Sequence, residues 1–305
     1  MKKYVLAVCI ALGINSASNA QFLSQSDIQK IKKAKLLIVK SGDANLDEDM
    51  QASLKELWKF SPLGETVTLE EAKKQSKENE EVMYVTLEHV ESKSLSHGSV
   101  PSSERNNPMA KEHYLHRTVS TGTILTIKQN KSNYASVFLP SFSNKITKEI
   151  LYFGISDLQC VVTMIDTKKL KNGFKVNSNF KETYTPKLKK KTLYILEDWL
   201  NPKFTEKDVK TLYKAPAKVV DYFTWKDAIL NKTPGIAYSI VVPCPSGGEY
   251  AYHHYLMDAE TGNVLAISKL NASVKIAGIS VTQGNTGYIT DKNLKNYNEA
   301  QLGDW

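Results

Sequence analysis

The chain has 305 residues, of which 41% are hydrophobic and 24% are charged, with 15 tyrosines and 9 phenylalanines. This composition excludes an intrinsically disordered chain, and the length is sufficient for two domains. The formal net charge at pH 7 is +8, but only Arg105 and Arg117 among the 40 basic residues are arginines, which argues against nucleic acid as a partner.

The first 20 residues have the organisation of a secretory signal peptide. Two lysines precede an apolar run, residues 4–14, and Ser18-Asn19-Ala20 fits the small-x-small rule for cleavage. Cys9 lies inside the apolar run and follows Val8, where a lipoprotein signal would need a small residue. We therefore expect cleavage near Ala20 and a periplasmic or secreted protein. Cleavage removes two lysines and lowers the net charge from +8 to +6, and no later segment is predicted to cross a membrane.

The first predicted α/β unit follows, at residues 21–168. An apolar run without strict alternation, Leu36–Val39, predicts a strand buried on both faces. A helix capped by Asp47 is expected next, followed by a strand at Glu65–Val67 and a second helix with the capping box Thr68-x-x-Glu71. The last predicted elements are a three-stranded meander and a helix, at Met83–Leu87, Tyr114–Arg117, Ile124–Lys128 and from Thr147.

Two segments interrupt the regular pattern. The stretch Val90–Lys111 is rich in serine, asparagine and proline, and it predicts a disordered loop. The stretch Lys168–Lys191 contains nine lysines and one acid, and we assign residues 169–190 to a basic linker. A solvated spacer is the simpler interpretation, and contact with an anionic surface is the alternative.

The second predicted unit, residues 191–305, has the same order of elements. A buried strand is expected at Leu193–Leu196, and Thr205 with Asp208 predicts a capped helix. The strand Val219–Phe223 and the capping box Thr224-x-x-Asp227 are predicted next, before three further strands and a short polar helix from Thr290.

Collinear matches between the two units predict a tandem repeat. The matched pairs include "KLLIVK" with "TLYILE", "LKELWKF" with "VKTLYKA", and "VMYVTL" with "IAYSIVV". In addition, "HYL" followed by "TG" occurs in both Glu112–Gln129 and His253–Leu270. We therefore predict an α/β (α+β) fold with two tandem βαβαβββ-α repeats, each a mixed sheet packed with helices.

The two adjacent histidines His253 and His254 invite a metal or catalytic interpretation. Because neighbouring side chains on a strand point to opposite faces, these two histidines cannot both bind one ion. His113 and His116 are three residues apart and also face opposite ways. The Thr-Gly pairs predict hairpins in which Gly122 and Gly262 occupy left-handed turn positions. No metal site and no cofactor are expected.

Cys244 is the other candidate for chemistry. It lies in "VVPCPSGGEY", a stretch typical of a rigid hairpin tip, and His253 or His254 could approach it across the hairpin. A Cys–His hydrolase is therefore the alternative to an incidental thiol. A disulfide between Cys160 and Cys244 is left open. The chain contains no nucleophile elbow, P-loop, HExxH motif or dinucleotide fingerprint.

Two passages carry a resemblance to known proteins: "LWKFSPLGETVTLEEAKK" and "VFLPSFSNKITKEILYFGISDLQ". Together with the signal peptide, they make the chain similar to uncharacterised exported α/β-repeat proteins of Bacteroidota-type bacteria. This resemblance implies export and an α/β fold, and it supplies no catalytic residues.

Two similar units without a convergent set of catalytic residues predict a non-enzymatic binding or scaffold protein. We expect its partner, an unknown protein or envelope ligand, to bind where the two lobes meet.

Overall fold

The computed structural model describes residues 23–97, 115–142, 145–171, 176, 179, 185–246, 248–269, 274–276, 279–281 and 287–299. The predicted signal peptide and most of the predicted loop at residues 90–111 lie outside these residues. So do His113 and the greater part of the basic linker.

The first lobe contains a five-stranded mixed sheet in the order β2-β1-β3-β4-β5. Strand β1 is parallel to both of its neighbours, β2 and β3, whereas β4 and β5 continue the sheet in antiparallel fashion. The strands are β1 (Lys35–Val39), β2 (Leu63–Val67), β3 (Val82–His97), β4 (Leu115–Gln129) and β5 (Ser132–Leu139).

The second lobe repeats this topology, with the strand order β7-β6-β8-β9-β10. Here β6 is parallel to β7 and β8, and β9 and β10 are antiparallel. The predicted α/β fold with two similar lobes is therefore confirmed. The strands are β6 (Thr192–Leu196), β7 (Ala217–Val220), β8 (Ile236–Ser246), β9 (Glu249–Asp258) and β10 (Val264–Lys269), and β11 (Val274–Ile276) pairs with β12 (Ile279–Val281) outside the sheet.

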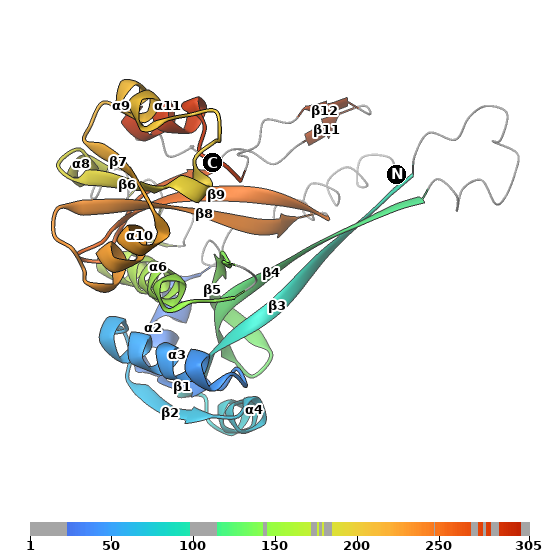
Figure 1. The fold of residues 1–305 in the computed structure, drawn as a ribbon. Coiled ribbons are helices and arrows are strands. Elements are labelled where there is room, and N and C mark those ends of the chain that lie inside the picture. Colours follow the sequence, from blue (N-terminus) through green and yellow to red (C-terminus); the bar gives the residue numbers. More distant parts are fainter. Residues whose placement is uncertain are drawn as a thin grey trace, which may run out of the picture.

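Helices cover the sheets (Figure 1), and α2, α3, α4, α9 and α10 begin at a side-chain cap. The capping boxes at Thr68 and Thr205 are confirmed, and each threonine accepts a hydrogen bond from the backbone three residues later. The main helices are α2 (Gln25–Lys33), α3 (Ala44–Leu57), α4 (Leu69–Glu78), α6 (Lys148–Thr167), α9 (Glu206–Leu212), α10 (Tyr222–Leu230) and α11 (Asp291–Glu299), with short turns η3 (Glu197–Trp199) and α8 (Thr185–Leu188).

Two predicted caps are wrong. The cap of α3 is Asp43, whereas Asp47 lies within the helix and accepts a hydrogen bond from Ser41 N at 2.6 Å. In the second lobe, Asp221 caps α10 by accepting from Thr224 N at 2.7 Å, so the predicted box that starts at Thr224 does not form. The preceding strand ends at Val220 for the same reason.

The meander of the first lobe also differs from the prediction. Residues 115–117 of one predicted strand and Ile124–Lys128 of the next belong to one long strand, β4, and Gly122 pairs with Val90 in its middle. Gly122 is therefore not a turn residue. Gly262 is one, with φ of 70° in the turn after β9. Residues 90–97 of the predicted loop belong to β3, which continues to His97.

The "HYL" match does not connect equivalent positions. Val85 of β3 and Ser239 of β8 occupy equivalent positions in the two sheets. Val85 pairs with Ile127 in the first lobe, and Ser239 pairs with Leu256 in the second. Leu256 therefore corresponds to Ile127 and not to Leu115. The topological repeat holds, but this particular sequence match is coincidental.

The helix α6 lies between the two lobes (Figure 1), where it contacts α2 and α3 on one side and α10 and β10 on the other. Its length and composition would allow it to span a membrane, contrary to the sequence prediction, but 83% of its apolar window is buried inside the protein. It is therefore a core helix. The ring of Phe153 packs edge-to-face on Tyr255 of the second lobe, with 5.0 Å between centroids.

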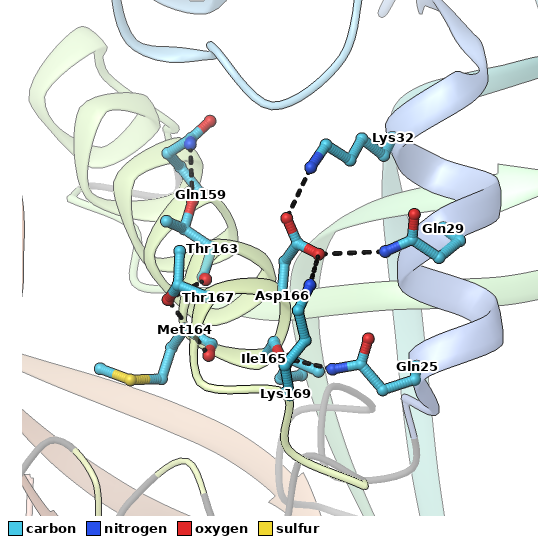
Figure 2. Close-up of polar contacts among 10 residues, drawn as sticks. All are labelled: Gln25, Gln29, Lys32, Gln159, Thr163, Met164, Ile165, Asp166, Thr167 and Lys169. Atoms are coloured by element: carbon cyan, nitrogen blue, oxygen red, sulfur yellow. Dashed lines mark hydrogen bonds and ion pairs between the residues drawn. The ribbon is translucent and has the colours of Figure 1, made fainter.

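Polar contacts fix the end of α6 to α2, a helix that the sequence reading missed (Figure 2). Asp166 accepts hydrogen bonds from Gln29 Nε2 at 3.0 Å and Lys32 Nζ at 2.7 Å. The Lys32 ammonium lowers the pKa of Asp166 below its usual value. The signal for α2 was the capping box formed by Ser24 and Asp27.

The carboxyl end of the basic segment contacts the protein body at Leu188 and Lys191. Leu188 is 1% exposed, and the ammonium of Lys191 lies 2.8 Å from Asp258 Oδ1 in a nearly buried ion pair. The lysines at 168, 169, 171, 187, 189 and 190 are exposed, as expected for a solvated segment.

Candidate functional site

A groove with a volume of about 750 Å³ lies where the two lobes meet. Its walls come from the loop between β1 and α3, from the middle of β3 and β4, from the start of α6 and from α10 of the second lobe. Its volume is within the range typical of small-molecule sites.

The topology of the first lobe explains this location. The chain leaves β1 for β2 on one side and then returns to β3 on the other side of β1. The pairing of β1 with β3 ends at Ile38 and Val85, and beyond this point Ser41 and the segment Leu87–His89 line the groove. The groove therefore lies at the carboxyl ends of parallel strands where the strand order reverses, the position at which open α/β sheets bind ligands.

The corresponding position in the second lobe is filled with aromatic rings. Trp199, just after β6, stacks on Phe142 at a centroid distance of 5.4 Å and meets Trp225 edge-to-face at 5.3 Å. The indole Nε1 of Trp225 donates a hydrogen bond to Ser239 O at 3.1 Å. As a result, the second lobe contributes a wall to the groove of the first lobe.

A buried carboxylate lies at the groove, in the first turn of α6. Glu149 is 1% exposed, and its Oε1 accepts hydrogen bonds from the hydroxyls of Thr147 and Tyr222. Its Oε2 is buried and has no hydrogen-bond partner among the described residues. The positive end of the helix dipole favours a carboxylate here, but a buried oxygen without a donor is costly.

Tyr222 joins this carboxylate to the second lobe. Burial, and then the hydrogen bond to Glu149, raises the pKa of Tyr222 to about 12. Its hydroxyl therefore keeps its proton, and remains a donor, throughout the physiological pH range.

Three lysines line the groove without an ion-pair partner. In the described part of the chain, no carboxylate oxygen lies within 4 Å of the ammonium of Lys145, Lys148 or Lys226. Lys148 and Lys226 are half-buried, and they come from α6 and α10 respectively. Half-buried ammonium groups of this kind are well suited to holding an anionic group of a ligand.

Acidic residues of the groove are partly engaged elsewhere. Asp43 caps α3 by accepting from Asn45 N at 3.0 Å, and Glu88 pairs with Lys128 at 2.6 Å. Asp49, half-buried on α3, has no ion-pair partner within 4 Å among the described residues.

The residues singled out from the sequence lie elsewhere. His253 and His254 face opposite sides of β9, as predicted, and both are buried. His254 Nδ1 lies 2.9 Å from the hydroxyl of Tyr297 on α11. His253 pairs with Val242 of β8, so the register places it on the same face as Cys244, two residues further along β8.

Cys160 and Cys244 are both buried, and no disulfide joins them. Cys244 is 1% exposed, and its thiol contacts Val242 O at 3.8 Å. Burial raises the pKa of the Cys160 thiol on α6 to about 12. Neither cysteine belongs to the groove. Within the described ranges, no group of three or more histidine, cysteine, aspartate or glutamate side chains could hold a metal ion.

Comparison of the chain with protein-family models, with curated proteins and with solved structures finds no match. The candidate site therefore rests on the geometry of the groove.

Proposed function

We propose that the chain is an exported, non-enzymatic binding protein that holds a small ligand in the groove between its two lobes. The observation that carries this proposal is the groove of about 750 Å³ at a strand-order reversal, with the unpaired Oε2 of Glu149 buried beside it. The predicted signal peptide supports export.

The Cys–His hydrolase alternative has weaker support. The register does place Cys244 and His253 on one face, but the thiol is 1% exposed and lies outside the groove. A nucleophilic cysteine needs access to its substrate and a lowered pKa.

The binding proposal can be tested by thermal unfolding against a panel of amino acids, peptides, sugars and nucleotides. A Thr123→Trp variant places an indole in the groove. A Val119→Trp variant is the matched control, since Val119 lies on the same strand, is 52% exposed and does not line the groove.

We expect at least one compound to raise the melting temperature of the wild type and of Val119→Trp, but not that of Thr123→Trp. If no compound distinguishes the two variants, the groove is not a ligand site and the proposal fails.

A further inference from the structure

The groove is lined by charges of both signs that have no ion-pair partner among the described residues. Lys145, Lys148 and Lys226 supply ammonium groups, whereas Asp49 and Glu149 supply carboxylates. The other acids of the groove are already used for a helix cap and an ion pair. A purely anionic ligand would meet two uncompensated carboxylates, and a purely cationic ligand would meet three lysines.

Two of the three lysines, Lys148 and Lys226, lie on α6 and α10, and these two helices contact each other. Lys226 follows Tyr222 by one helical turn, so the two side chains share one face of α10. Tyr222 donates to Glu149, and Lys148 directly precedes Glu149 on α6. Lysines from two different lobes therefore line the same groove as this carboxylate.

The unsatisfied Oε2 of Glu149 requires a hydrogen-bond donor. The residue is 1% exposed but lines the groove, so a donor in the groove reaches this oxygen only when the Glu149 side chain shifts toward the groove. An ammonium group of a ligand would satisfy the oxygen and neutralise the carboxylate in one contact. Leu46, Leu87, Ile146 and Leu230 add apolar surface for the rest of the ligand.

We propose that the groove binds a zwitterionic ligand with a free amino group and a free carboxylate, as in an amino acid or a short peptide. The amino group lies at Glu149 and Asp49, and the carboxylate lies between Lys148 and Lys226. This inference rests on the proposed function of the groove and adds the chemical class of its ligand.

Calorimetry with one tripeptide, Ala-Leu-Ala, in four forms tests the inference: with both ends free, with the amino end acetylated, with the carboxyl end amidated, and with both ends blocked. Free leucine, measured in parallel, distinguishes an amino-acid site from a peptide site. We expect the free tripeptide to bind the full-length protein, and blocking either end to weaken binding at least tenfold.

Variants assign each end of the ligand. Lys226→Gln should remove the difference between the free and amidated peptides, and Glu149→Gln should remove the difference between the free and acetylated peptides. Lys218→Gln, on an exposed position of β7, is the matched control and should leave all the differences unchanged. Asp49→Asn provides a second test of the amino end if Glu149→Gln does not fold.

The outcomes separate the two proposals. Equal binding of the free and the doubly blocked peptide would overturn the zwitterion inference and leave the groove intact as a ligand site. The same holds if neither the peptide nor leucine binds while a compound that is not a zwitterion binds in a Thr123-dependent manner. If no compound depends on Thr123, both proposals fail.

Discussion

The hydroxyl of Tyr222, on a helix of the second lobe, donates a hydrogen bond to the carboxylate of Glu149 in the first turn of α6. Thr147 donates to the same oxygen. The contact closes one side of the groove and links the two lobes through a buried, charge-assisted hydrogen bond.

Removing the hydroxyl should therefore destabilise the protein. We expect Tyr222→Phe to lower the free energy of unfolding by about 1.5–3 kcal/mol, because a buried carboxylate loses one of its two donors. Urea unfolding measures this change. Tyr194→Phe is the control, since no hydrogen bond of the Tyr194 hydroxyl is found in the described structure. Equal effects of the two substitutions would contradict the role of Tyr222.

Asp166 should contribute to the acid sensitivity of the protein. The hydrogen bond from Lys32, followed by that from Lys169, lowers the pKa of this carboxyl in the folded state. Its stabilising contribution is present above the unfolded pKa, about 3.9, and is lost as the pH falls through the lower folded value.

We therefore expect the stability of Asp166→Asn to fall less steeply than that of the wild type below about pH 4. Urea unfolding between neutral and acidic pH measures this difference. Asp227→Asn serves as the control, because Asp227 is exposed and has no ion-pair partner within 4 Å in the described part of the chain. Parallel pH profiles for the wild type and Asp166→Asn would refute the assignment.

Gly262 should be intolerant of a side chain for two separate reasons. Its φ of 70° favours glycine, and a Cβ would lie 2.6 Å from Ser156 Oγ on α6. Gly235 has a similar φ of 73° but open space around it. We expect Gly235→Ala to cost about 1–2 kcal/mol and Gly262→Ala to cost about 1–3 kcal/mol more. Equal melting temperatures for the two variants would show that the turn moves freely away from α6.

Cys244 should react slowly with thiol probes in the folded protein, because its side chain is 1% exposed. We expect both Cys160 and Cys244 to be labelled only as the protein unfolds, with mass spectrometry of labelled peptides as the measurement. Rapid, saturable labelling of the native protein that disappears in Cys244→Ala would instead favour the Cys–His hydrolase.

The fold was predictable where local patterns coincide with tertiary packing. The buried runs that became β1 and β6 and the capping boxes at Thr68 and Thr205 all follow from short-range chemistry. The cap of α3 was misplaced because Asp43 and Asp47 are both acceptable caps by sequence, and the turn at Gly42 selects the first.

The groove between the lobes was not predictable, because its lining residues form no recognisable sequence motif. Glu149 looks like an ordinary acidic residue in the first turn of a helix, and such residues are usually exposed there. Its burial depends on α10, which lies more than 70 residues away in the chain. The adjacent histidines His253 and His254 suggested a site by sequence, but both are buried on β9 in the second lobe.

The placement of α6 has a consequence for how the protein can be divided and synthesised. This helix closes the first repeat in sequence, yet the ring of Phe153 packs on Tyr255, a residue that a ribosome adds about a hundred positions later. Until the second lobe has been synthesised, the side of α6 that faces this lobe remains exposed. A fragment that stops after the first repeat would therefore expose an apolar surface that favours aggregation. The two lobes are better regarded as halves of one cooperative folding unit.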